Sequence, residues 1–256
     1  MGEGGDPAGA ADAGRPVSAA ELFDGLGITY EEAFGRLPAQ SDAVDWLAAR
    51  LAPGSRVLDV GSGTGRPVAE RLADAGFEVT GIDVSRVMVE LARAQVPKAR
   101  FEQCDVRDFT PEGGFDAVCS FFPLLMMTRA EASAALRRMA GWLVPGGYLV
   151  SATVPADVED AEVEWMGRRV RVSSCSTDAY LRLLREDCNL EVLHHSVSLF
   201  LPDGDLAAPE EHLFCYARRR GGGAAGSEGA AGSEGAAGSE GAAGWGGRET
   251  RGRVGQ

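Results

Sequence analysis

Three aspartates, Asp59, Asp83 and Asp105, each stand at the carboxyl end of a short apolar stretch typical of a buried strand. A carboxylate can accept hydrogen bonds from an ammonium group, from both hydroxyls of a ribose, or from the exocyclic amine of a purine. The carboxyl ends of parallel strands lie at one edge of a sheet, so three such groups could bind one ligand together. In chain order they would bind its ammonium, sugar and base portions, which describes S-adenosylmethionine.

A glycine-dense turn, Gly61-x-Gly63-x-Gly65, follows the first of these aspartates. Glycine lets a ligand approach the backbone, and the helix expected after the turn would direct its free N–H groups toward it. A dinucleotide fingerprint needs glycine where Arg66 stands, and a phosphate-binding P-loop needs a lysine that this turn lacks. The turn therefore excludes a P-loop triphosphate site and disfavours a NAD-dependent oxidoreductase.

The elements that would position these residues alternate along the chain. Alternating strands and helices predict βαβ units and a parallel sheet that is covered on both faces. Ser41 and Ser85 are expected to be N-caps of helices. Strands are expected at 56–60, 77–83, 99–105, 115–121, 146–154, 190–201 and 210–219, and helices at 41–52, 66–75, 85–95, 129–143 and 176–189. The prediction is an α/β fold with a seven-stranded, mostly parallel sheet, helices on both faces, an antiparallel edge strand and a helical N-terminal cap.

Five motifs carry a resemblance to a known family: "LDVGSGTG" (58–65), "GIDVS" (81–85), "CDV" (104–106), "FDAV" (115–118) and "LVPGGYLV" (143–150). In this order and spacing, the chain from Ser41 to Arg220 resembles the small-molecule branch of class I S-adenosylmethionine-dependent methyltransferases. The resemblance implies the fold of that family and S-adenosylmethionine as cofactor. The residues expected to bind the cofactor are Asp59, Gly61, Ser62, Gly63, Gly65, Asp83, Val84, Met88, Asp105, Val106 and Phe121.

The methyl acceptor is less defined by the sequence. Methylating enzymes that act on nucleobases or glutamine carry N/D/S-P-P-Y/F after the fourth strand, whereas this chain has "SFFP" (120–123). The apolar residues that follow (Phe121, Phe122 and Leu124 to Met127) predict either an apolar acceptor pocket or ordinary core packing. Tyr30 and Phe34 could cover the cofactor or simply pack.

No catalytic residue and no metal site is predicted. A general base would help a hydroxyl acceptor and is optional for a free amine. The candidate bases are His194, His195 and His212, and the first two must face opposite sides of a strand. Arg168, Arg169 and Arg171 could bind a substrate carboxylate or form a solvated hairpin rim.

Composition limits the function further. The chain has 256 residues, 45% of them hydrophobic, and a net charge of −13. This charge disfavours nucleic acid as a partner. No apolar run is long enough to span a membrane and no signal peptide is evident, so a cytoplasmic location is expected. The five cysteines lack C-x-x-C spacing and are expected to be free thiols.

The expected domains are a disordered start (1–17), a methyltransferase domain (18–220, with a helical cap at 18–52 and a hairpin insert at 155–175) and a disordered low-complexity tail (221–256). The predicted enzyme is a monomer or homodimer that methylates a small, fairly apolar metabolite, with O-methylation in secondary metabolism as the first expectation. C- or N-methylation of a small molecule stays open. A second alternative also stays open, in which the protein is non-catalytic, binds S-adenosylmethionine and recruits partners through its tail.

Overall fold

The computed structural model describes residues 16–201 and 209–221. The predictions for the first residues and for the repetitive tail fall on 1–15 and 222–256, which lie outside this range. All elements below belong to the unit that ends at Gly222. In the described ranges, no helix combines the length and the apolar character needed to cross a membrane.

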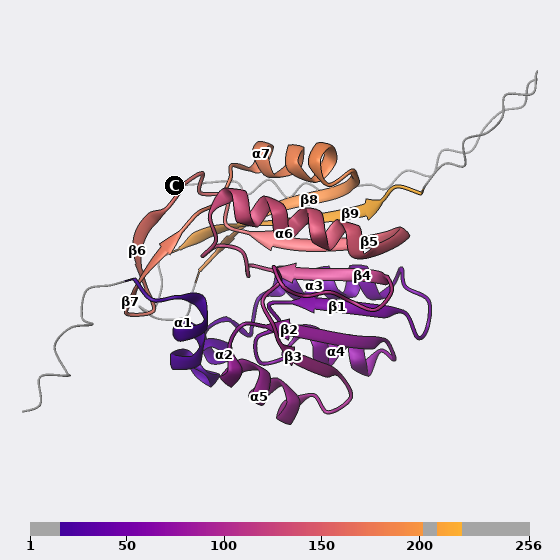
Figure 1. The fold of residues 1–256 in the computed structure, drawn as a ribbon, viewed down its shortest axis with the longest axis horizontal. Coiled ribbons are helices and arrows are strands. Elements are labelled where there is room, and N and C mark those ends of the chain that lie inside the picture. The colour runs from indigo at the N-terminus through magenta and orange to yellow at the C-terminus, as the bar shows by residue number, and fades with distance from the viewer. Residues whose placement is uncertain (1–15, 202–208, 222–256) are drawn as a thin grey trace, which may run out of the picture. The chain divides into compact units, whose positions relative to one another are not determined.

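The centre of this unit is a seven-stranded sheet with strand order β3-β2-β1-β4-β5-β9-β8 (Figure 1). The first five of these strands run parallel, β9 pairs antiparallel with β5, and β8 pairs antiparallel with β9. This confirms the predicted sheet and its antiparallel pair at one edge. The strands are β1 (Arg56–Val60), β2 (Glu78–Asp83), β3 (Arg100–Gln103), β4 (Phe115–Phe121), β5 (Leu143–Thr153), β8 (Leu190–Phe200) and β9 (Glu210–Arg219).

Helices cover both faces of the sheet, so the central strands are buried on both sides and their sequences are almost continuously apolar. One face packs against α6 (Arg129–Trp142), α7 (Thr177–Arg182) and the π-helix η2 (Leu183–Asp187). The other packs against α3 (Pro38–Ala48), α4 (Val68–Asp74) and α5 (Arg86–Gln95). In β1, Leu58 and Val60 point to the first core and Val57 to the second.

The N-cap prediction is right for one helix and wrong for another. Ser85 caps α5, since its Oγ accepts a hydrogen bond from the Met88 amide at 3.1 Å. Helix α3 does not begin at Ser41. Pro38 occupies its first turn and Leu37 is its N-cap. Proline costs nothing there because the first helical N–H groups have no partner within the helix, and its fixed φ suits that position.

Two further segments lie at the same end of the sheet (Figure 1). One is α1 (Ala19–Leu26) with α2 (Ile28–Phe34), and the other is a two-stranded hairpin of β6 (Ala161–Trp165) and β7 (Arg168–Val172). Aromatic contacts join them: the Phe34 and Trp165 rings stack with centroids 5.4 Å apart, and the Tyr30 and Trp165 centroids are 6.3 Å apart. We call α1 and α2 the cap. The cap and the hairpin form one aromatic wall above the sheet end that carries the glycine turn.

Candidate functional site

The glycine turn after β1 requires glycine at its first position. Gly61, Gly63 and Gly65 all have positive φ (71°, 52° and 81°), a region that side chains rarely adopt. A Cβ on Gly61 would lie 2.3 Å from Cβ of Pro123. The Gly61 and Ser62 amides donate to the Ile82 carbonyl at 2.8 and 3.0 Å. The turn is thus held against the end of β2, with its backbone open to a ligand.

Asp83 is the last residue of β2 and lines a cavity, and its contact with a ribose stays a prediction. Its Oδ2 accepts from the Gly63 amide at 2.9 Å and its Oδ1 from the Ser85 amide at 2.8 Å. Burial raises the pKa of Asp83, and these two hydrogen bonds oppose the rise. Each carboxylate oxygen keeps further acceptor capacity. The side chain therefore lines a cavity in a fixed orientation, able to accept the two hydroxyls of a sugar.

Asp59, in β1, is 2% exposed and does not line the cavity that holds Asp83. Burial, reinforced by the charge of Asp83, raises the pKa of Asp59 to about 7. Its Oδ2 is one of the few buried side-chain polar atoms of the described residues that have no hydrogen-bond partner. An unpaired buried carboxylate is costly, and a cationic ligand group would relieve that cost. This is the electrostatic feature that an ammonium group fits.

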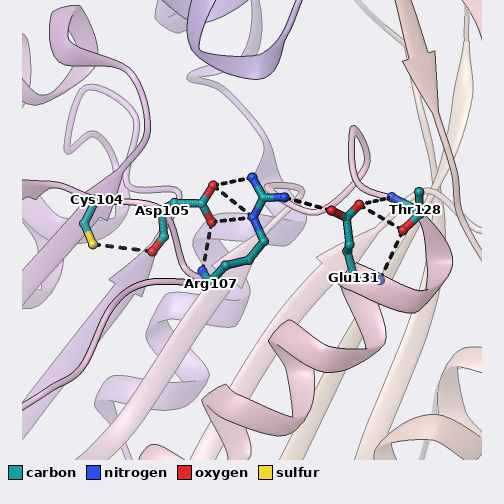
Figure 2. A network of polar contacts seen from close by, with 5 residues as sticks. All are labelled: Cys104, Asp105, Arg107, Thr128 and Glu131. Carbon is teal, nitrogen blue, oxygen red and sulfur yellow. Dashed lines mark hydrogen bonds and ion pairs between the residues drawn. The ribbon is translucent and has the colours of Figure 1, made fainter.

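Asp105 is placed differently from the other two aspartates. Its carboxylate is held by the guanidinium of Arg107, with Nη2–Oδ2 at 2.7 Å, and by the Arg107 amide at 2.8 Å. Arg107 also contacts Glu131, which caps α6 together with Thr128 (Figure 2). Asp105 does not line the cavity that holds Asp83. Its contact with a purine amine stays a prediction, and here the side chain links the loop after β3 to α6.

The other predicted cofactor residues divide into two groups. Val84, Val106 and Phe121 line a cavity of about 80 Å³ together with Gly61, Gly63 and Asp83. Ser62, Gly65 and Met88 do not line it, and Met88 is fully buried in the first turn of α5. We call this space the donor cavity. It is smaller than the roughly 300–1,000 Å³ of typical ligand pockets, so a larger ligand requires its walls to move.

The cap closes the donor cavity from above. Phe23 and Tyr30 line it, and Asp24 of α1 accepts hydrogen bonds from the Ser85 hydroxyl at 2.6 Å and from the Val87 amide at 3.1 Å. The sequence analysis considered Tyr30 as a cover but missed Asp24, because nothing in its local sequence shows a partner 61 positions away. The cap is therefore anchored at the start of α5, two residues from Asp83.

A second cavity, of about 430 Å³, adjoins the first. The two share five lining residues: Ala19, Phe23, Tyr30, Phe122 and Pro123. Aromatic and aliphatic side chains from the cap, the hairpin and the end of β4 form most of its wall, among them Phe34, Leu125, Met126, Val163, Trp165 and Val170. We call it the acceptor cavity. Of the apolar residues after β4, Leu125 and Met126 face it, whereas Leu124 and Met127 face the donor cavity.

One histidine reaches the acceptor cavity. His212, on β9, is 3% exposed, lines the cavity and contacts Glu210, with Nε2–Oε1 at 2.9 Å. His194 and His195 are exposed on β8 and line none of the three cavities found. Glu210 is a residue that sequence reasoning missed. The sequence pattern Glu-x-His in the expected strand could have indicated this pair, because alternate strand residues share a face.

The hairpin arginines do not form a wall of either cavity. Arg169 pairs with Glu162 at 3.3 Å, and Arg171 pairs with Asp160 through a short contact. They lie at the exposed outer side of the hairpin. This arrangement matches the solvated rim that the sequence analysis held open beside carboxylate binding.

Comparisons with known proteins place this geometry in context. A family model described as "Methyltransferase domain" matches residues 57–147. The chain is 38% identical over 135 residues to a putative methyltransferase, YqeM, of Bacillus subtilis, covering 50% of this chain and 54% of that protein. It is 36% identical over 118 residues to a ubiquinone biosynthesis O-methyltransferase of Xanthomonas campestris, covering 43% and 48%. The match thus spans about half the length of these relatives.

Solved structures are similar over more of the chain. The 1,6-didemethyltoxoflavin-N1-methyltransferase of Burkholderia thailandensis, solved with 1,6-didemethyltoxoflavin and S-adenosylhomocysteine, superposes with a TM-score of 0.60 at 19% identity. The superposition covers 81% of this chain and 93% of that one. At this level of identity the likeness concerns the fold. The superposition covers a larger share of the chain than the residues 57–147 that the family model matches.

Proposed function

Because residues 57–147 match a family model described as a methyltransferase domain, we propose that this chain transfers a methyl group from S-adenosylmethionine to a small, fairly apolar hydroxyl compound. Family and fold agree with those expected from the five motifs and from the strand order. One observation carries the proposal: the donor cavity, which contains the Asp83 carboxylate, and a larger apolar cavity share a wall of five residues. Methyl transfer needs two ligands held in contact with their reacting atoms aligned.

The residues of the donor side fit this cofactor. The orphaned Oδ2 of Asp59 suits its ammonium, the carboxylate of Asp83 suits its ribose, and Val84 and Val106 can pack on its adenine. When bound, the cofactor would supply the methyl group as part of a sulfonium. The protein's own contribution would then be to align the acceptor and to exclude water.

The acceptor side disfavours an anionic molecule and suits one of moderate size. Its volume, about 430 Å³, lies in the usual range for small-molecule sites. Among the described residues that line it there is no lysine or arginine, and Glu164 and Glu210 are its acidic members. A phosphate or carboxylate on the acceptor would find no counter-charge there. A role in secondary metabolism is part of the proposal, since such a wall suits a varied apolar metabolite.

Direct binding and turnover together test the proposal. Isothermal titration calorimetry with S-adenosylhomocysteine should show one site per chain. Incubation with labelled S-adenosylmethionine and an extract of small molecules from the native host should label an extractable, apolar product, identified by mass spectrometry. Absence of S-adenosylhomocysteine binding would refute the proposal, and a labelled protein or nucleic acid in place of a small product would refute its acceptor class.

A further inference from the structure

The acceptor cavity contains a pair of residues, Glu210 and His212, that share one face of β9. They are two positions apart in the strand, and the intervening Glu211 is exposed. The Glu210 carboxylate contacts His212 Nε2 at 2.9 Å. A carboxylate beside Nε2 favours the imidazole tautomer that carries its proton on Nε2. In that tautomer Nδ1 of His212 has a free lone pair. No second hydrogen bond to the His212 ring is found among the described residues.

The imidazole ring is held by aromatic neighbours from two other strands. Phe200 of β8 stacks on it with centroids 5.0 Å apart and planes at 15°, and Phe122, just after β4, lies 4.5 Å away. Phe122 has a φ of 66°, a backbone conformation that is strained for a residue other than glycine. Its amide bonds the Ala152 carbonyl at 2.9 Å. The strain at Phe122 places its ring against His212 at the boundary of the two cavities.

Among the described residues that line the cavity, His212 is the only nitrogen base. Tyr30 of α2 lines both cavities, and burial, with the charges of Asp83 and Glu210, raises the pKa of Tyr30 to about 12. Tyr30 therefore keeps its proton at neutral pH. Glu164 of β6 and Glu210 complete the charged set among the described lining residues, and Ser198 of β8 lies opposite His212 in the sheet.

We propose that His212, oriented by Glu210, accepts the hydroxyl proton of a flat, uncharged, phenol-type acceptor in this cavity. The stacked rings of Tyr30, Phe34 and Trp165 favour a planar molecule, and the lack of cationic lining residues disfavours an anionic one. The inference rests on the proposed function and deepens it. In the step, the acceptor oxygen forms a bond to the methyl carbon as the carbon–sulfur bond breaks. The electron pair of the carbon–sulfur bond stays on sulfur. The hydroxyl proton passes to Nδ1 of His212 and then to solvent.

A chromogenic phenol tests the proton transfer without turnover. The probe is 4-nitrophenol, whose phenolate absorbs visible light, titrated into the protein saturated with S-adenosylhomocysteine and into the free protein. At a pH about one unit below the pKa of the free phenol, we expect a bound phenolate fraction about three times that of the free phenol. His212→Phe should bind the probe without this excess, and Glu210→Gln should roughly halve it.

Two controls separate the outcomes. His195→Phe, which changes an exposed histidine of β8, should leave the phenolate signal unchanged, and each variant should bind S-adenosylhomocysteine within about twofold of the native chain. Three results would overturn the inference: persistence of the excess phenolate in His212→Phe, absence of any excess in the native chain saturated with S-adenosylhomocysteine, or failure of the probe to bind that saturated chain. Normal S-adenosylhomocysteine binding in that case would leave the proposed function standing, whereas its loss in the native chain would refute the function itself.

Discussion

The donor and acceptor cavities differ in what forms their walls. The donor cavity is bounded by backbone that bends at Gly61 and Gly63 and by a buried carboxylate whose oxygens accept backbone amides. The acceptor cavity is bounded by side chains, mostly aromatic and aliphatic, from the cap, the hairpin and β9. A backbone wall has one shape, whereas a side-chain wall changes with each substitution. Under the proposed function, the donor side determines whether methyl transfer occurs, and the acceptor side determines which compound receives the methyl group.

The largest effect is expected at the backbone wall. Gly61→Ala forces a Cβ to within 2.3 Å of Pro123 at a φ of 71°, so the turn or the residues after β4 must shift. We expect affinity for S-adenosylhomocysteine, measured by calorimetry, to fall by about a hundredfold. Gly76→Ala, at a similarly positive φ of 89° but with open space around it, is the matched control and should keep full affinity.

Asp59 gives the next largest effect, on stability against pH. Its pKa of about 7 in the folded chain exceeds the ordinary unfolded value of about 4, so the folded protein keeps a proton that the unfolded chain releases between these values. The contribution of Asp59 protonation to the free energy of unfolding is therefore complete below about pH 4. It is lost as the pH rises to about 7.

Urea unfolding of the free protein measures this dependence. Between about pH 5 and pH 7, the native chain should lose about 2 kcal/mol more than Asp59→Asn. Asp83, whose pKa is also raised, is present in both proteins, so the difference reports Asp59 together with its interaction with Asp83. Equal pH dependence of the two proteins would contradict the raised pKa.

Asp83 and Asp105 offer a sharper contrast within the donor side. Asp83→Ala removes the carboxylate that lines the cavity and should weaken S-adenosylhomocysteine binding about tenfold. Asp105→Ala should weaken it about twofold or less, because that carboxylate is occupied by Arg107 in this structure. Calorimetry on both variants decides the matter, and an equal loss would show that Asp105 leaves Arg107 to contact the cofactor.

The smallest effect on affinity is expected at the cap. Asp24→Ala removes the acceptor of the Ser85 hydroxyl and of the Val87 amide. The cap should open more readily, so stopped-flow association of S-adenosylhomocysteine should quicken while its affinity changes by less than about threefold. A slower association would show that the cap guides entry in place of blocking it. Among the described residues the anchor joins Asp24 of α1 to Ser85 and Val87, so Glu32→Ala, at an exposed position of α2, serves as the control.

The two sides also differ in how far they can be predicted. The donor side depends on contiguous motifs, so the glycine turn, Asp83 and the Ser85 cap could be located from spacing alone. The acceptor cavity brings Tyr30, Trp165 and His212 together from distant parts of the chain, and no local period encodes that contact. The start of α3 was misjudged because Ser41 is a good cap residue, although Pro38 three positions earlier suits a first helical turn.

The shared wall also has a kinetic consequence. Phe23 and Tyr30 belong to the cap and bound both cavities, and the closed donor cavity, at about 80 Å³, is too small for a whole nucleoside. Displacing the cap to admit the methyl donor also removes part of the wall of the acceptor cavity. The acceptor can bind only after the donor has entered and the cap has closed again. Catalysis should therefore follow a compulsory order, in which the donor binds first and the demethylated donor leaves last.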